Sequence, residues 1–143
     1  VWRLITPIFL HGGIFHLLFN VYWIYVFGNM LENRRTRWHF IGLVLGIALV
    51  SNAAQYLMSG PNFVGISGVV YGLFGYCWVK SRLEPNSGIW LSPFLVNLML
   101  LFLVLGMFGV MENVANTAHG VGLLTGMLIA VVPLIRKPAS RKS

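Results

Sequence analysis

The chain has 143 residues, of which 57% are hydrophobic and only 9% are charged, and its mean hydropathy is +0.79. This composition excludes an ordinary soluble domain and is typical of a membrane protein. The formal net charge of +7 would suit a nucleic-acid partner, but the positions of the charges have a simpler explanation, so no nucleic acid is expected to bind.

Five apolar segments, separated by short polar or Pro- and Gly-bearing connectors, predict an all-α membrane protein with five transmembrane helices in one bundle. The segments cover residues 14–30, 38–58, 67–79, 91–110 and 115–135. Because no repeat or long linker divides them, residues 1–143 are expected to form a single membrane domain. Residues 1–13 would then belong to an outer loop, and residues 136–143 would form a cytoplasmic basic tail.

The basic residues gather on one side of this predicted five-span chain. Nine of the ten lie in the first connector, in the third connector or after the last helix: Arg34, Arg35, Arg37, Lys80, Arg82, Arg136, Lys137, Arg141 and Lys142. By the positive-inside rule this side is cytoplasmic, and Val1 begins outside.

The third apolar segment is unusually short. Its 13 residues give a helix of roughly 20 Å, against a hydrocarbon core of about 30 Å. If Lys80 and Arg82 lie at the cytoplasmic surface, residues 59–65 must enter the membrane as irregular backbone, which is tolerated only beside protein or a water-filled cavity. The helix rise also puts His119 about 24 Å above Ile135, close to the depth of Ser67.

Ser67 and His119 are therefore predicted to form a hydrolytic pair within the membrane. Two faces of small residues would let their helices approach closely. These faces consist of Gly68, Gly72 and Gly75 on the third helix and Gly122 and Gly126 on the last helix. Close packing would bring a nucleophile and its base within hydrogen-bonding reach, and the free N–H groups at the start of the third helix would stabilise an oxyanion.

Simpler interpretations of these residues stay open at this point. Ser67 alone is typical of a helix N-cap, and His119 alone is typical of a hydrogen bond between helices. Tyr71, one turn after Ser67, would either orient the imidazole or pack as an ordinary aromatic residue.

A second polar group is predicted at the start of the first helix. His16 and Asn20 share a face and can both donate hydrogen bonds toward a developing oxyanion, although hydrogen bonding between helices is an alternative. His11 would brace this end. Near the end of the second helix, a further polar group either holds the hydrolytic water or bonds to neighbouring helices: Ser51, Asn52 and Gln55.

Other chemistries lack the residues they need. The chain contains no Asp, so a Ser/His/Asp triad is excluded and only a dyad remains. The four histidines have no nearby carboxylate or thiolate cluster, and the acidic residues are only Glu32, Glu84 and Glu112. We therefore expect neither a metal nor a cofactor.

Taken in order, the motifs resemble those of the bacterial rhomboid intramembrane serine proteases over essentially the whole chain. The resemblance rests on Trp2-Arg3, on His11–Asn20 (HGGIFHLLFN), on Glu32-Asn33-Arg34, on Gly65–Gly72 (GISGVVYG) and on Ala118-His119 followed by Gly122 and Gly126.

This resemblance implies a role for each site residue. Ser67 would be the nucleophile and His119 its base. The oxyanion hole would consist of His16, Asn20 and the backbone N–H of Ser67. Tyr71 would support His119, and Gly65 would let the loop backbone approach the substrate strand.

The resemblance also implies the setting of the reaction. The family core has six membrane helices, so this chain is expected to be a fragment that lacks the first helix and most of a long outer loop. The active site would open to the periplasmic side of a bacterial inner membrane, and the substrates would be transmembrane proteins within the lipid.

Two rival functions are considered. A catalytically silent rhomboid relative would bind membrane helices, but such relatives usually lose the serine or the histidine. A small transporter or channel would need a polar route through both leaflets, whereas the inner half of each predicted helix is apolar.

Overall fold

A computed structural model describes residues 2–109 and 115–136, and within them the chain is helical, with no strand. The five α-helices are α1 (Ile14–Glu32), α2 (Arg37–Ser59), α3 (Ser67–Leu83), α4 (Pro93–Met107) and α5 (Asn116–Arg136). Three short 3-10 helices are η1 (Trp2–Leu4), η2 (Thr6–Phe9) and η3 (Pro85–Ser87). The predicted all-α architecture with five helices is therefore confirmed.

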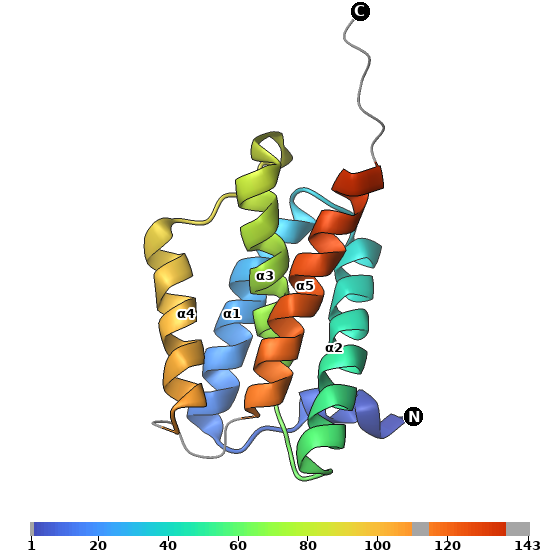
Figure 1. Ribbon diagram of the computed structural model, residues 1–143, viewed down its shortest axis with the longest axis vertical. Helices are drawn as coiled ribbons and strands as arrows, with labels where there is room; N and C mark the ends of the chain where they lie inside the picture. The colour runs from blue at the N-terminus through green and yellow to red at the C-terminus, as the bar shows by residue number, and fades with distance from the viewer. Residues whose placement is uncertain (1, 110–114, 137–143) are drawn as a thin grey trace, which may run out of the picture.

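Helix α3 lies at the centre of the bundle, with α5 directly against it, α2 on one side and α1 and α4 on the other (Figure 1). Every residue of α3 from Gly68 to Cys77 is buried. A helix that is buried on all sides needs small residues wherever a neighbouring backbone comes close. On the side of α3 that contacts α5, these small residues are glycines.

The contact between α3 and α5 is a close approach of two backbones. A methyl group on Gly122 would overlap the carbonyl of Gly68, and one on Gly126 would overlap the carbonyl of Gly72. The two predicted glycine faces thus pack against each other, and only glycine leaves room for this separation.

The predicted end of the third helix is wrong by four residues. Helix α3 ends at Leu83 rather than Val79, so Lys80 and Arg82 lie in its last turn and not in the connector. Lys80 is 2% exposed, and its Nζ lies 3.1 Å from the Glu84 carboxylate. Because the ammonium has a partner and cations are favoured at a helix C-terminus, the helix continues past it. At 17 residues its length is about 25 Å, still short of the membrane core.

Helix α4 is shorter than the predicted segment 91–110. It begins at Pro93 because the Ser92 hydroxyl caps it by accepting from the N–H of Leu95 at 3.2 Å, and Pro is well tolerated in a first turn. It ends at Met107. Val110 lies outside the described residues, as does the predicted basic tail beyond Arg136.

Three helices of the described residues are long and apolar enough to cross a membrane: Ile14–Glu32, Arg37–Ser59 and Asn116–Pro133. Helix α4 is apolar but shorter. Together with the large apolar surface left exposed on the helices, this supports a multi-pass membrane protein.

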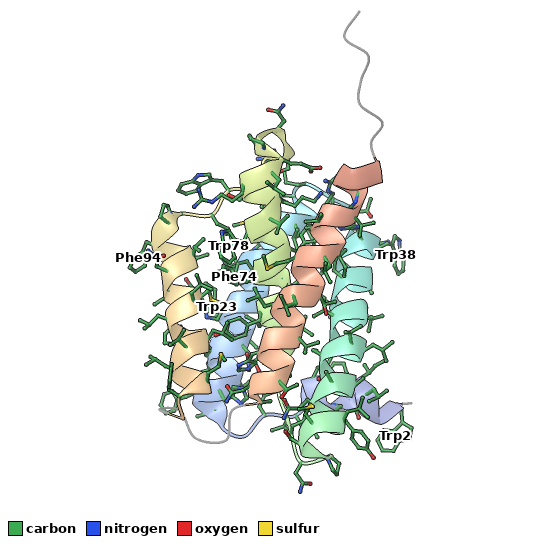
Figure 2. The ribbon with its side chains drawn as sticks, in the orientation of Figure 1. Trp2, Trp23, Trp38, Phe74, Trp78 and Phe94 are labelled. Carbon is green, nitrogen blue, oxygen red and sulfur yellow. The ribbon has the colours of Figure 1, made fainter. Side chains whose placement is uncertain are left out.

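Aromatic side chains fill the space between α1, α3 and α4. Trp23, Phe74 and Trp78 point into it, whereas Trp38 and Phe94 point away from the bundle (Figure 2). Phe74 and Trp78 stack with ring centroids 5.5 Å apart. The rings of Phe19 in α1 and Phe102 in α4 lie edge to face with centroids 5.4 Å apart, so aromatic packing also joins α4 to α1.

Candidate active site

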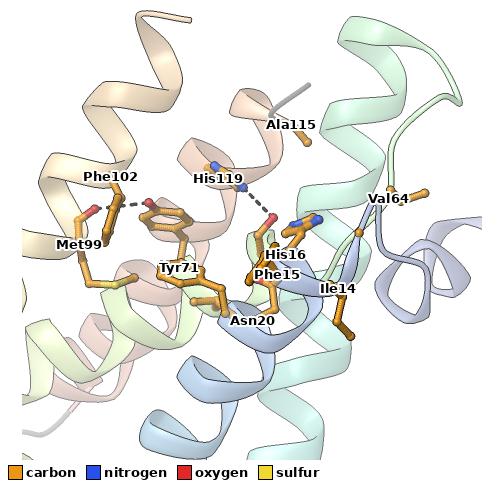
Figure 3. A pocket seen from close by; sticks show the side chains of 15 residues that line it. Ile14, Phe15, His16, Asn20, Val64, Tyr71, Met99, Phe102, Ala115 and His119 are labelled. Carbon is orange, nitrogen blue, oxygen red and sulfur yellow. Dashed lines mark hydrogen bonds between the residues drawn. The ribbon is translucent and has the colours of Figure 1, made fainter. Parts of the chain in front are cut away.

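Ser67 and His119 meet where α3 and α5 pack together. The Ser67 Oγ and the His119 Nε2 lie 2.6 Å apart, which is a hydrogen bond (Figure 3). His119 is buried and is the fourth residue of α5, and Ser67 is the first residue of α3. The N-cap interpretation of Ser67 does not hold, because Ile66 occupies that position and no side chain caps the helix.

Tyr71 lies against the imidazole. The two ring centroids are 4.7 Å apart with the planes tilted by 37°. The Tyr71 hydroxyl donates a hydrogen bond of 3.4 Å to the carbonyl of Met99 in α4. The tyrosine therefore contacts His119 with its ring and α4 with its hydroxyl, which restricts the orientation of the imidazole.

His16 and Asn20 of α1 face the same space. A methyl group placed on Gly65 would come within 2.7 Å of His16 Cε1, so the loop backbone and this imidazole are in close contact. Asn20 is 1% exposed, and its Nδ2 has no hydrogen-bond partner among the described residues. A buried donor without a partner is costly and typical of a site where a ligand supplies the acceptor.

These side chains line a cavity of about 650 Å³. Its polar members are His16, Asn20, Ser67, Tyr71 and His119, and they are surrounded by a mostly apolar wall. The apolar side chains include Phe15, Phe19, Val64, Val70, Met99 and Phe102. An apolar cavity with a few converging polar groups is the usual form of a small-molecule or peptide site.

The connection between α2 and α3 has irregular backbone, as the sequence predicts, but it begins one residue later than the predicted segment 59–65, because Ser59 still belongs to α2. It contains neither helix nor strand from Gly60 to Ile66. Gly65 has φ +117°, a conformation that side-chain-bearing residues rarely adopt. Its N–H donates to the carbonyl of Pro7 at 2.9 Å, which joins this loop to the segment before α1.

The polar group predicted near the end of α2 consists of Ser51, Asn52 and Gln55, and two of these three form hydrogen bonds to other segments. The Asn52 Nδ2 donates to the carbonyl of Leu4 at 2.7 Å, and the Gln55 Oε1 accepts from the N–H of Ala118 at 2.9 Å. Ser51 donates within its own helix, to the carbonyl of Ala48 at 3.4 Å. For Asn52 and Gln55 the structure therefore favours bonding between segments over the alternative of holding water.

His11 lies beside His16, with the ring centroids 5.3 Å apart and the rings edge to face. Its Nε2 is buried and has no partner among the described residues. Within residues 2–109 and 115–136, no three His, Cys, Asp or Glu side chains are grouped closely enough to hold a metal ion.

Sequence reasoning did not identify the individual residues of α4 and of the segment before α1 that complete the site. Phe102 and Met99 of α4 line the cavity, and Pro7 accepts the hydrogen bond from Gly65. No sequence signal identifies them, because Phe102 and Met99 lie in a uniformly apolar segment and Pro7 acts through its backbone carbonyl.

Comparison with known proteins agrees with this architecture. The family model of the Rhomboid domain matches residues 1–136. The chain therefore belongs to the rhomboid family of polytopic helical membrane proteins.

Among its relatives are the rhomboid proteases GlpG of Salmonella choleraesuis (strain SC-B67) and Salmonella newport (strain SL254), each 41% identical to this chain over 133 residues. The alignments include 92% of this chain and 48% of each relative. The chain thus spans about half the length of the curated relatives it matches.

Proposed function

We propose that this protein is an intramembrane serine endopeptidase that cleaves peptide bonds in or beside the transmembrane segments of other membrane proteins. The observation that carries the proposal is the 2.6 Å contact between Ser67 Oγ and His119 Nε2 at the wall of a cavity large enough for peptide side chains. The rhomboid proteases among its relatives support the same reaction.

In this mechanism Ser67 attacks the scissile carbonyl while His119 Nε2 accepts the hydroxyl proton. The tetrahedral intermediate collapses to an acyl-enzyme, and His119 returns the proton to the leaving amine. A water molecule then attacks the acyl carbon with His119 again as base, which releases the new carboxyl end and restores the Ser67 hydroxyl. No cofactor takes part.

The oxyanion of each tetrahedral intermediate needs hydrogen-bond donors that are in place before the reaction. We assign this role to the side chains of His16 and Asn20 and to the backbone N–H of Ser67. The buried Asn20 Nδ2, which has no partner within residues 2–109 and 115–136, supports this assignment, because an oxyanion would supply the missing acceptor. The Ser67 N–H is at the start of α3, where the helix dipole favours negative charge.

Four further residues would support the dyad. Tyr71 restricts the His119 ring through the contact at 4.7 Å. Gly122 and Gly126 allow α5 to approach α3, which sets the distance between base and nucleophile. Gly65 keeps the loop backbone free of a side chain beside His16, so that a substrate strand can approach.

The membrane setting follows from the same proposal. The protein would reside in a bacterial inner membrane with the active site open to the periplasmic side, since most basic residues lie toward the opposite end. Its partners would be transmembrane protein substrates and the surrounding lipids. We expect no nucleic acid to bind, because the positive-inside rule accounts for the positions of the basic residues.

The proposal is tested by labelling the purified protein in detergent micelles with a serine-directed fluorophosphonate and by assaying cleavage of a labelled single-span substrate. We expect an adduct on Ser67 and a loss of cleavage of at least about 1,000-fold in Ser67→Ala and His119→Ala. Activity should also fall on acidification, because a protonated His119 cannot act as a base.

A Ser67→Ala variant that cleaves as well as the parent would contradict the proposal. Binding of membrane helices without cleavage by the parent would point instead to a catalytically silent relative. That alternative is not favoured, because the dyad is intact and in contact.

A further inference from the structure

We propose that Asn52 is a positioning residue that fixes the loop wall of the cavity and so controls substrate binding, without acting on the dyad. It would act by anchoring the N-terminal segment, defined here as residues Trp2–Phe9. The inference rests on the proposed function, since it assigns a residue to the binding step of that reaction.

The first step is the hydrogen bond from Asn52 to the N-terminal segment. Asn52 lies in the apolar helix α2 and is 3% exposed. Its Nδ2 donates to the carbonyl of Leu4, at 2.7 Å, across 48 positions in the chain. A buried amide in a membrane helix is costly unless it has a partner. Asn52 therefore stabilises the position of the N-terminal segment in which the Leu4 carbonyl lies against α2.

The second step leads from Leu4 to the loop. Within the N-terminal segment, Ile5 donates to Trp2 and Ile8 donates to Ile5 through backbone bonds of 3.0 and 3.1 Å. These turns make the segment compact. Three residues after Leu4, the carbonyl of Pro7 accepts the N–H of Gly65 at 2.9 Å. The segment is therefore anchored to α2 at one point and holds the loop at another.

The third step leads from the loop to the cavity. Val64 and Ser67 both line the cavity, and Gly65 lies between them in the chain. Gly65 also adopts φ +117°, a backbone conformation that residues with a side chain rarely reach, and in it the N–H is directed at Pro7. If the N-terminal segment shifts, the wall at Val64 shifts with it, and the shape presented to a substrate changes.

The dyad depends on different contacts. The distance between Ser67 and His119 is set by the close packing of α3 on α5. Gln55, one turn after Asn52 on the same helix, accepts from the N–H of Ala118, the residue before His119. Asn52 and Gln55 thus bind different segments, the one before α1 and the start of α5, and Gln55 serves as the matched control.

The experiment compares Asn52→Leu with Gln55→Leu in the whole chain, in detergent micelles. Both substitutions replace a buried side-chain amide with an apolar group. Three quantities are measured: the rate of fluorophosphonate labelling at Ser67, kcat and KM for a labelled single-span substrate, and hydrogen exchange of the Gly65 amide.

For Asn52→Leu we expect labelling within about twofold of the parent, a fall in kcat/KM of about five- to tenfold that comes mainly from KM, and faster exchange at Gly65. This fold-change corresponds to the loss of one hydrogen bond. For Gln55→Leu we expect slower labelling and unchanged exchange at Gly65. If Asn52→Leu does not fold, Asn52→Ser replaces it, because the shorter side chain cannot reach Leu4.

Equal loss of labelling and cleavage in the Asn52 variant would overturn the inference, as would unchanged exchange at Gly65. Failure of the proposed function is distinguishable from this: the parent would then show neither labelling nor cleavage, and the exchange at Gly65 would still decide whether Asn52 holds the loop.

Discussion

The two ends of α3 differ in that only the N-terminal end has unpaired polar atoms in its buried surroundings among those compared next. Around its N-terminal end, the Asn20 Nδ2 and the His11 Nε2 are buried without partners among the described residues. Around its C-terminal end, the Lys80 ammonium lies 3.1 Å from Glu84, and the Tyr76 hydroxyl lies 3.1 Å from the His39 Nε2. Arg35 approaches the same Glu84 carboxylate at 3.9 Å.

This difference indicates that the N-terminal end of α3 belongs to a binding site and that its C-terminal end stabilises the fold. An unpaired buried donor costs about 1–3 kcal/mol, and the one on Asn20 lies in the cavity wall, where a bound ligand would provide the partner. A paired buried charge supports the fold, and removing one member leaves the other uncompensated. We therefore expect substitutions at the N-terminal end of α3 to change activity and those at its C-terminal end to change stability.

Among the variants that test this contrast, the largest effect is expected for Asn20→Ala. Removing one oxyanion donor should lower kcat by about 100-fold or more, while the unfolding free energy should change by less than about 1 kcal/mol, because the Asn20 Nδ2 has no hydrogen-bond partner among the described residues. Cleavage of a single-span substrate and thermal unfolding in detergent measure the two effects. Asn29→Ala, an exposed position on the same helix, is the matched control and should match the parent. An inactive but strongly destabilised Asn20→Ala would mean that Asn20 supports the fold.

The next largest effect is expected from a change in the packing of α5 against the middle of α3. In Gly126→Ala the new methyl group would overlap the Gly72 carbonyl, and since both atoms belong to helix backbones, the helices must separate. We expect a loss of about 1–3 kcal/mol in the unfolding free energy and slower labelling of Ser67. Gly120→Ala, on the same helix with no heavy atom within 4 Å of the added group, should change stability by less than about 0.5 kcal/mol. Equal stability of the two variants would show that the close packing is not required.

The smallest effect on catalysis is expected at the C-terminal end of α3. Glu84→Gln removes the countercharge of the buried Lys80 and should lower the unfolding free energy by about 2 kcal/mol. The labelling rate of the folded protein should stay within about twofold of the parent. Adding Lys80→Met should recover much of the lost stability, because the uncompensated charge is then gone. A fall in the labelling rate without a loss of stability would contradict the contrast between the two ends.

Much of the fold could be predicted from local patterns in the sequence. The apolar segments predicted five helices because a membrane helix must satisfy its own backbone and present apolar side chains to lipid. The ends were less predictable: α3 continues through Lys80 to Leu83 because Glu84 pairs with a lysine that otherwise resembles a connector residue. The glycines on α3 and α5 predicted that these two helices pack together, because faces of small residues in membrane helices allow close helix packing.

The sequence by itself therefore determined the helical membrane class, the family and the pairing of the Ser67 and His119 helices, because periodicity and short motifs are local properties. Only the tertiary structure decided which groups complete the site. That Tyr71 reaches Met99, that His16 meets Gly65 and that Asn52 holds Leu4 all depend on segments far apart in the chain. Such contacts follow from how the helices pack in three dimensions. The sequence of an apolar segment does not indicate which other segment it will contact.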